Sequence, residues 1–284
     1  MRTVKKIHKA EYKPIDDLIT YSPLPSRTLQ HIDPFLFLNH HGPQQYPPNN
    51  NGLPFGPHPH RGMETVTFIL DGDILQKDSS GHESIIDSGG IQWMTAGRGL
   101  IHAETSSDKF KLLGGLLEIL QLWINLPSKY KLIESKYVGL QKDKIPNFIL
   151  DDGKVKLKLI SGKWNGNAGA FETLTNVFLS LLDLNPGAQL SFSVPLDHNI
   201  FFYVIKGKVK TNGMIIDEMN LAEFYNDDPE IKIEAENAST ILLGHAKPFN
   251  EPILAYGSFV MNTERKIEEA YSDYRQGKFG KWIE

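Results

Sequence analysis

Four side chains of the types that can bind transition metals occur in two short motifs of the same spacing. His58 and His60 flank a proline, and His102 and Glu104 flank an alanine. In an extended strand, residues i and i+2 point to the same face, so each motif presents two ligands together. If the two strands are neighbours in a barrel, the four side chains converge on one point. Imidazole and carboxylate groups together suit Fe, Mn, Ni, Cu or Zn.

A structural explanation competes with this interpretation. The chain contains 10 histidines, so some pairs at i and i+2 arise by chance, and an isolated pair is more often a surface or core feature. The second motif, however, follows Gly97 and Gly99, which allow a tight backbone turn directly before His102. Three imidazoles and one carboxylate would leave open positions around a metal ion, as in catalytic rather than structural sites.

The elements that must carry these ligands are predicted to be strands. Short apolar runs alternate with Gly, Asn and Asp turn signals, which predicts an all-β protein built as a sandwich or barrel. The clearest runs are 65–74, 89–97, 154–162, 199–210 and 239–246. A Pro-, Asn- and Gly-rich loop is expected over 42–56, directly before the first ligand pair. The only strongly helical pattern lies near the C-terminus, where Ile267, Ala270, Tyr271 and Tyr274 recur at helical spacing.

The two halves of the chain share a degenerate repeat. FILDGDI at 68–74 and YVIKGKV at 203–209 align Gly72 with Gly207, which predicts two copies of one β-domain, over residues 1–145 and 146–284. The residues of the second copy that match His58 and His60 in this alignment are Ser193 and Pro195. Because neither is a good transition-metal ligand, the second domain is predicted to lack a metal. His198 and His245 are expected to be isolated structural or surface residues.

Composition limits the function classes. The chain has 284 residues, with 30 Lys+Arg against 34 Asp+Glu and a net charge of -4, so direct nucleic-acid binding is not expected. It contains no cysteine, which excludes disulfides, thiolate nucleophiles and Cys-type zinc sites. The charged N-terminus has no apolar secretory core, and no apolar stretch is long enough to cross a membrane. We therefore expect a soluble cytoplasmic protein.

The motifs resemble those of the pirin family, a group of two-domain cupin proteins. The resemblance lies in HPHRGMETVTFILDGDI (58–74) and IQWMTAGRGLIHAE (91–104), and it continues in LQLWINLP (120–127) and the C-terminal 256–280. It covers nearly the whole chain. By this resemblance the fold is two cupin barrels, of the β-sandwich or jelly-roll type, in tandem with a C-terminal helix.

The resemblance also implies a ligand set. The metal is expected to be Fe(II), held by His58, His60, His102 and Glu104, with Mn, Ni, Cu and Zn as alternatives. In the wider cupin pattern the carboxylate ligand would fall on Glu64, whereas in pirins it is the residue that matches Glu104. We therefore expect Glu64 to be a hydrogen-bonding group beside the ligands. Arg61 either holds an anionic part of the substrate or forms a surface ion pair.

Three functions remain open at this stage. Pirin-like proteins are associated with quercetin 2,3-dioxygenase activity, which implies a flavonoid or other small aromatic substrate, O2, and Glu104 as the group that takes the substrate's hydroxyl proton. Pirins are also described as regulators, which implies a protein that responds to the metal or its oxidation state and binds a protein partner. A different cupin enzyme acting on a small organic substrate is the third, since fold and ligands alone do not choose the reaction.

Overall fold

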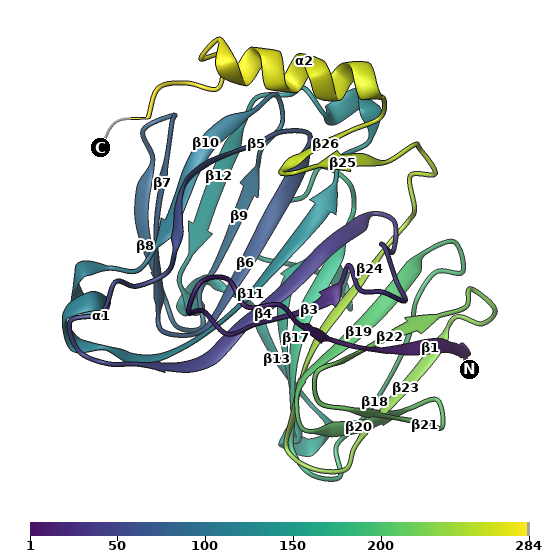
Figure 1. Ribbon diagram of the computed structural model, residues 1–284. Coiled ribbons are helices and arrows are strands. Elements are labelled where there is room, and N and C mark those ends of the chain that lie inside the picture. Colours follow the sequence, from purple (N-terminus) through teal and green to yellow (C-terminus); the bar gives the residue numbers. More distant parts are fainter. Residues whose placement is uncertain (283–284) are drawn as a thin grey trace. The chain divides into compact units, whose positions relative to one another are not determined.

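The computed structural model describes residues 1–282. Within them nearly every element is a β-strand, which confirms the all-β prediction, and the chain forms two compact units (Figure 1). The unit that contains the predicted ligands, called here the histidine unit, comprises residues 12–21, 35–143 and 249–282. The second unit comprises residues 1–11, 22–34 and 144–248.

The division of the chain differs from the linear boundary predicted at residues 145 and 146. The main division falls between Asp143 and Lys144, and each end of the chain joins the unit formed mainly by the other half. Strand β1 (Val4–Lys9) pairs antiparallel with β22 (Asn220–Phe224) of the second unit. The C-terminal helix α2 (Glu264–Arg275) packs within the histidine unit. Strand pairing and side-chain packing, not sequence order, therefore define the units.

The histidine unit is built from two main sheets. The larger has the strand order β12 (Lys136–Leu140), β9 (Ile91–Thr95), β6 (Met63–Asp71), β11 (Gly115–Asn125), β4 (Phe35–Tyr46), β3 (Thr20–Leu24) and β2 (Glu11–Tyr12). The smaller has the order β5 (Phe55–His60), β10 (Leu100–Thr105), β7 (Asp73–Asp78) and β8 (Glu83–Asp87). A short hairpin, β25 (Leu254–Tyr256) and β26 (Phe259–Met261), precedes α2. The predicted loop at 42–56 is shorter than expected, because β4 continues to Tyr46.

The second unit repeats this plan. Its larger sheet has the order β1, β22, β19 (Asn199–Lys206), β24 (Ser239–Ala246), β17 (Phe178–Leu184), β14 (Val155–Ser161) and β13 (Asn147–Leu150). Its smaller sheet has the order β18 (Gln189–Ser193), β23 (Glu230–Ala235), β20 (Lys208–Thr211) and β21 (Met214–Asp217). A separate hairpin joins β15 (Lys163–Trp164) to β16 (Asn167–Ala168). Two units of sandwiched sheets confirm the predicted tandem cupin architecture.

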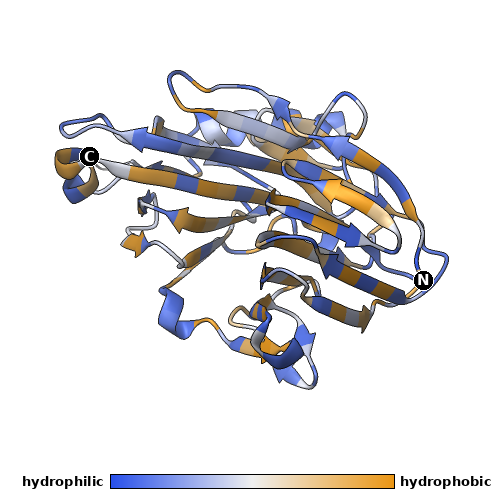
Figure 2. Cartoon of the chain, turned by 90° about the horizontal axis from the view of Figure 1, so that it is seen from below, coloured by the Kyte–Doolittle hydropathy of each residue, from blue (hydrophilic) through white to orange (hydrophobic). Residues whose placement is uncertain are grey.

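Alternating side chains explain why these segments form half-buried strands. In β23 the isoleucines at 231 and 233 are buried, whereas Lys232 between them is not. This period of two places apolar residues on one face of a strand. Bands of opposite hydropathy alternate along several strands in Figure 2. In each unit the inward faces of the two sheets form a shared apolar core, with Ile69 and Ile74 in the histidine unit and Phe202 and Ile233 in the second.

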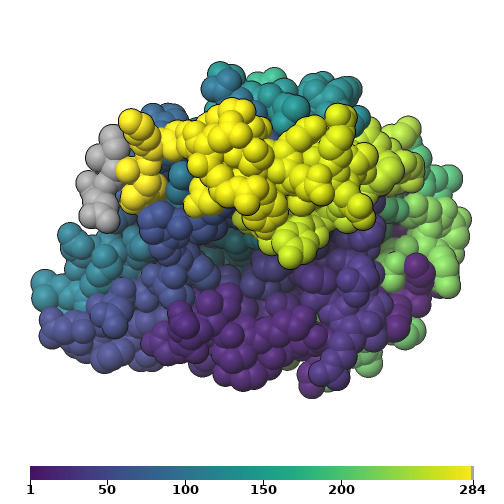
Figure 3. All heavy atoms as spheres, turned by 45° about the horizontal axis from the view of Figure 1, so that its top comes forward, coloured from purple at the N-terminus to yellow at the C-terminus, as the bar shows by residue number. Residues whose placement is uncertain are grey.

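Two α-helices belong to the histidine unit. The predicted C-terminal helix α2 begins after Thr263, whose side chain accepts a hydrogen bond from the main-chain N–H of Lys266. Its buried face packs with residues of β26 and β10, and Figure 3 shows this segment, in yellow, lying against other residues of the unit. The shorter α1 (Asp108–Leu113) was not predicted; Ser107 caps it, and its side chain accepts a hydrogen bond from the main-chain N–H of Phe110. Among the described residues, no helix has the length and apolar character needed to span a membrane.

Candidate metal centre

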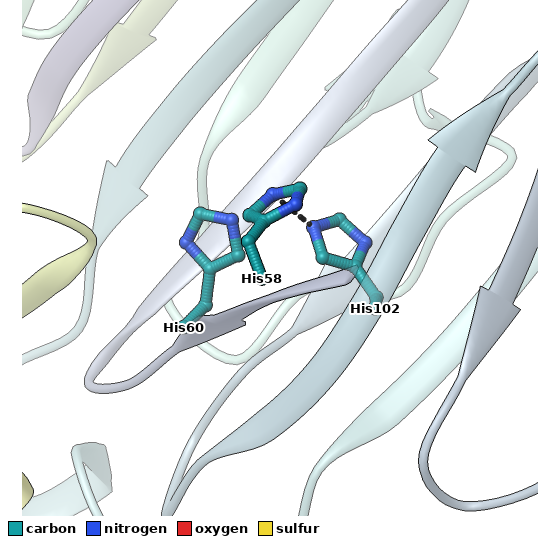
Figure 4. A group of neighbouring side chains, drawn as sticks. All are labelled: His58, His60 and His102. Atoms are coloured by element: carbon teal, nitrogen blue, oxygen red, sulfur yellow. Dashed lines mark hydrogen bonds between the residues drawn. The ribbon is translucent and has the colours of Figure 1, made fainter. Parts of the chain in front are cut away.

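Three histidines from two neighbouring strands meet at one point of the histidine unit. Strands β5 and β10 pair antiparallel, with His58 opposite His102 and His60 opposite Leu100. The three rings point toward one another in Figure 4. One nitrogen from each ring lies within 4.8 Å of the others, which is the arrangement of a group that could hold a metal ion. The spacing argument from the sequence therefore identifies the right strands and the right faces.

Hydrogen bonds fix the tautomers of two of these rings. His58 Nδ1 lies 2.7 Å from the main-chain oxygen of Gly56, which only accepts, so Nδ1 is the protonated nitrogen. His102 Nδ1 lies 3.1 Å from Gln76 Oε1 and donates in the same way. Both Nε2 atoms then carry lone pairs, and they face each other at 3.0 Å. If one ring carries a second proton, this contact is a hydrogen bond; if both rings are neutral, two lone pairs face the same point (Figure 4), which is the arrangement that a bound metal ion needs.

The third ring, that of His60, points to the same conclusion. It is buried, and neither of its nitrogens makes a hydrogen bond of ordinary geometry among the described residues, although the main chain of Ser258 lies near enough to oppose the lowering of its pKa by burial. Burial lowers the pKa of His60 and His102 well below the usual value, and the neighbouring histidines lower it further. Neutral imidazole is the form that binds metal. A buried ring with unsatisfied nitrogens is costly by itself, and a bound metal ion would satisfy one of them.

Glu104 lies beside the three histidines, fully buried. Its Oε2 is 3.9 Å from His102 Nε2 and accepts a hydrogen bond of 2.6 Å from Gln121. Its Oε1 accepts hydrogen bonds from Gln92 and, at 3.0 Å, from Thr67. Burial raises the pKa of Glu104, while His58 and these hydrogen bonds act in the opposite direction. The carboxylate is therefore held in one orientation with Oε2 toward the histidines.

Glu64 occupies a different environment. It lies on β6, where its Oε1 accepts a hydrogen bond of 2.6 Å from Thr95. Burial raises its pKa, and hydrogen bonds from Thr95 and Trp93 oppose that rise. Neither Glu64 nor Glu104 belongs to the group of converging ligand atoms, which contains the three histidines, but Glu104 has an oxygen 3.9 Å from His102 Nε2. This position fits the expectation of a hydrogen-bonding group.

Arg61 is engaged by the C-terminal segment of the same unit. Its guanidinium forms a 2.9 Å ion pair with Asp273 of α2 and stacks over the ring of Phe279 at 4.8 Å. Its Nε donates to the main-chain oxygen of Arg98. Of the two roles considered from the sequence, the ion pair is the one observed, although the side chain is mostly buried. It ties the strand that carries His60 to α2.

Several residues around the site could not be recognised from sequence. Gln76, Gln92 and Gln121 lie on three different strands and form no motif. His40 and His41 are both buried, with His40 Nε2 at 2.9 Å from Glu118 and His41 Nδ1 at 2.9 Å from Thr20. The available signal was their place in an apolar run, FLFLNHH, which continues strand β4.

Comparison with known proteins agrees with this geometry. Residues 18–124 match the pirin family, and residues 180–280 match the pirin C-terminal cupin domain. The chain belongs to the pirin family. A Pseudomonas aeruginosa relative named "putative quercetin 2,3-dioxygenase" is 36% identical over 94% of this pirin and 92% of its own length.

Solved structures support the same assignment. The crystal structure of a quercetin 2,3-dioxygenase from Acinetobacter baumannii covers 100% of both chains, with a TM-score of 0.92 and 35% identity. A bacterial pirin from Escherichia coli, solved in complex with nickel(II), has the same fold with a TM-score of 0.68 at 20% identity. The pirin fold and the tandem cupin architecture are therefore shared over the full length of this chain.

Proposed function

We propose that this pirin is an Fe(II)-dependent dioxygenase that opens the central ring of a flavonol such as quercetin. The observation that carries the proposal is the convergence of His58, His60 and His102 (Figure 4), which each offer one ring nitrogen within 4.8 Å of the others. The 36% identical relative bears a quercetin 2,3-dioxygenase name, as does the 35% identical solved structure. Both names support this reaction class.

Each residue has a separate role in the proposal. His58, His60 and His102 hold the ion through neutral nitrogens, with Gly56 and Gln76 keeping the lone pairs of two rings directed inward. Glu104 is the fourth ligand and takes the proton of the flavonol 3-hydroxyl group, because burial raises the proton affinity of this carboxylate. Bound iron would supply Lewis acidity and electron exchange with O2. The same donor set also suits Mn, Ni, Cu or Zn.

The direct test is O2 uptake with quercetin after anaerobic reconstitution of the full chain with Fe(II), with carbon monoxide as the second product measured. We expect uptake in the unmodified protein and its loss in His58→Ala. His198→Ala, in the second unit, is the matched control and should retain uptake. Iron bound in stoichiometric amount without any O2 uptake would contradict a flavonol dioxygenase.

A second candidate function rests on an exposed apolar patch in the histidine unit. Leu112, Leu113 and Leu116 are 61%, 61% and 43% exposed. Exposed apolar clusters mark protein interaction sites more often than chance. This favours a metal-responsive regulator that binds a protein partner through α1 and the start of β11. Crosslinking to the partner should depend on metal loading and be lost in Leu112→Ser/Leu113→Ser; capture that survives this double substitution contradicts it.

A further inference from the structure

The carboxylate of Glu104 is held differently at its two oxygens. Oε1 accepts hydrogen bonds from Thr67 and Gln92. Oε2, the oxygen at 3.9 Å from His102 Nε2, accepts one only from Gln121 among the described side chains. A carboxylate without such support can rotate about its last bond and present either oxygen. Gln121 is therefore the one donor that acts on the oxygen directed at the histidines.

Trp123 holds Gln121 in turn. The two residues lie at i and i+2 on β11, so their side chains share one face of the strand. The indole Nε1 of Trp123 donates to Gln121 Oε1 at 3.1 Å, which turns the amide so that its Nε2 points at Glu104. The indole itself stacks on Phe37, with centroids 4.4 Å apart, and meets the ring of His60 edge-on at 5.2 Å. Trp123 thus contacts one histidine directly and reaches Glu104 through one amide.

The second unit shows what occupies these positions where no carboxylate needs support. Phe37 lies opposite Trp123 in the histidine unit, and Phe178 lies opposite His245 in the second, stacked in both cases. Two residues before His245 is Leu243, which is buried in the apolar core. The amide of Gln121 is therefore matched by a leucine in the sheet that lacks the buried glutamate.

We propose that Gln121 and Trp123 are positioning residues that set Glu104 Oε2 in the direction of a metal ion held by the three histidines. This inference rests on Glu104 being a ligand, as in the proposed function. Residues that orient a metal ligand in this way contribute about 10–100-fold to metal affinity. Gln121 makes the direct hydrogen bond and should carry most of the effect, and Trp123 should act only through Gln121.

The test measures Co(II) binding to the full-length, metal-free protein by calorimetry, together with the visible Co(II) spectrum. We expect Gln121→Leu to weaken binding about 10–100-fold and to change the Co(II) absorption, since one ligand oxygen loses its orientation. Trp123→Phe keeps an aromatic ring on Phe37 and His60 but removes the N–H, so it should weaken binding in the same direction by a smaller factor. The thermal midpoint of each metal-free variant verifies folding.

The matched control removes a hydrogen-bond donor that acts indirectly on Oε1, the other oxygen of Glu104. Tyr137 OH lies 3.1 Å from Gln92 Oε1 and supports the amide that binds Glu104 Oε1. Tyr137→Phe should leave Co(II) affinity within about twofold of the unmodified protein. A loss as large as that of Gln121→Leu would contradict a special role for the Oε2 side.

A double substitution separates positioning from general packing. If Trp123 acts through Gln121, Trp123→Phe has no further effect on Co(II) affinity in the Gln121→Leu background. Additive losses, or unchanged affinity in Gln121→Leu, would overturn the inference. Glu104→Ala is measured beside them. Co(II) binding unchanged in Glu104→Ala would refute the ligand assignment itself, whereas loss there without loss in Gln121→Leu would refute only the positioning role.

Discussion

The two units use matching strand positions for opposite chemistry. The two units can be aligned by matching Phe37 to Phe178 and Trp123 to His245. In this alignment, residues that face each other on neighbouring strands of one unit correspond to residues that face each other in the other unit. Three hydrogen-bond donors to Glu104 in the histidine unit then correspond to apolar residues in the second unit: Thr67 to Phe202, Gln92 to Ala222 and Gln121 to Leu243. One unit surrounds a buried carboxylate, and the other fills the same space with hydrocarbon.

The smaller sheets show the same contrast. Glu104 lies opposite Gln76 on β7, and Ile233 lies opposite Thr211 on β20. Ile231, on the same face as Ile233, then stands where His102 stands. The same cupin sandwich therefore accommodates either a polar or an apolar interior. The fold does not require the metal site, and only the side chains distinguish the two interiors.

Histidine pairs sharpen the comparison. His198 Nδ1 and His245 Nδ1 in the second unit are 3.0 Å apart, the same separation as between His58 and His102. His198 and His245 are therefore not isolated from each other, and this contact fits the structural role that the sequence suggests for them. One of these two rings can donate to the other, so an ordinary hydrogen bond satisfies them. In the histidine unit the Nδ1 atoms of His58 and His102 already contact Gly56 and Gln76, so in neutral rings both Nε2 atoms are left to bind a metal ion.

The largest expected effect distinguishes these two histidine pairs directly. His102→Ala removes one of only three imidazoles and should abolish stoichiometric metal binding, whereas His245→Ala should leave it unchanged. Metal content per chain after reconstitution and dialysis, measured by elemental analysis, checks this. Metal lost equally from both variants would mean that the second unit also binds metal.

Next in size is the difference between the two buried glutamates. Glu104→Ala should weaken metal binding much more than Glu64→Ala, since only Glu104 has an oxygen beside the histidines. The affinity ratio between the two variants is the measurement, with Fe(II) or Mn(II) as the probe. Equal losses would show that the carboxylate ligand is misassigned.

Replacing a buried leucine of the second unit with the glutamine found at the matching position of the histidine unit tests the apolar interior of the second unit. Leu243→Gln places an amide where the histidine unit has one, but without a glutamate to receive it. We expect a loss of about 3 kcal/mol in the free energy of unfolding, from the buried unpaired amide and the lost apolar packing. Urea denaturation measures it. Leu243→Met, the control of similar volume, should cost less than about 1.5 kcal/mol.

The last prediction concerns acid stability. Burial lowers the pKa of His245 to about 3, whereas an unfolded histidine titrates near 6.5. Between these values the unfolded chain binds more protons, so this residue makes the free energy of unfolding fall as pH falls from about 6.5 to 3, by up to about 1.4 kcal/mol per pH unit. His245→Asn should flatten that dependence, as measured by urea denaturation at several pH values between about 3 and 6.5. Identical slopes in the variant and the unmodified protein would contradict the assignment.

The sequence was sufficient for those parts of the fold and site that depend on local pattern. Alternation of apolar residues predicts most strands, and helical spacing predicts α2. The i and i+2 spacing brings His58, His60 and His102 to one face, because a strand repeats every two residues. These inferences need only the geometry of one strand and one plausible neighbour.

Contacts between distant segments could not be predicted in this way. Gln76, Gln92 and Gln121 come together only because β7, β9 and β11 are placed by strand pairing, and a glutamine in a strand is unremarkable by itself. The assignment of each end of the chain to the unit formed mainly by the other half was not predicted for the same reason, since β1 pairs with a strand more than 200 residues later. Arg61 has two plausible roles until Asp273 is brought beside it.

The position of the C-terminal segment in the histidine unit also sets the order in which the protein can be completed during synthesis. Residues 249–282 belong to the histidine unit, although most of that unit is made within the first 143 residues. As the chain leaves the ribosome, the strand with His58 and His60 emerges long before α2, which holds it through Arg61 and Asp273. The histidine unit is therefore complete only after residues 249–282 have been synthesised. A chain truncated before residue 249 would contain the three histidines without this support.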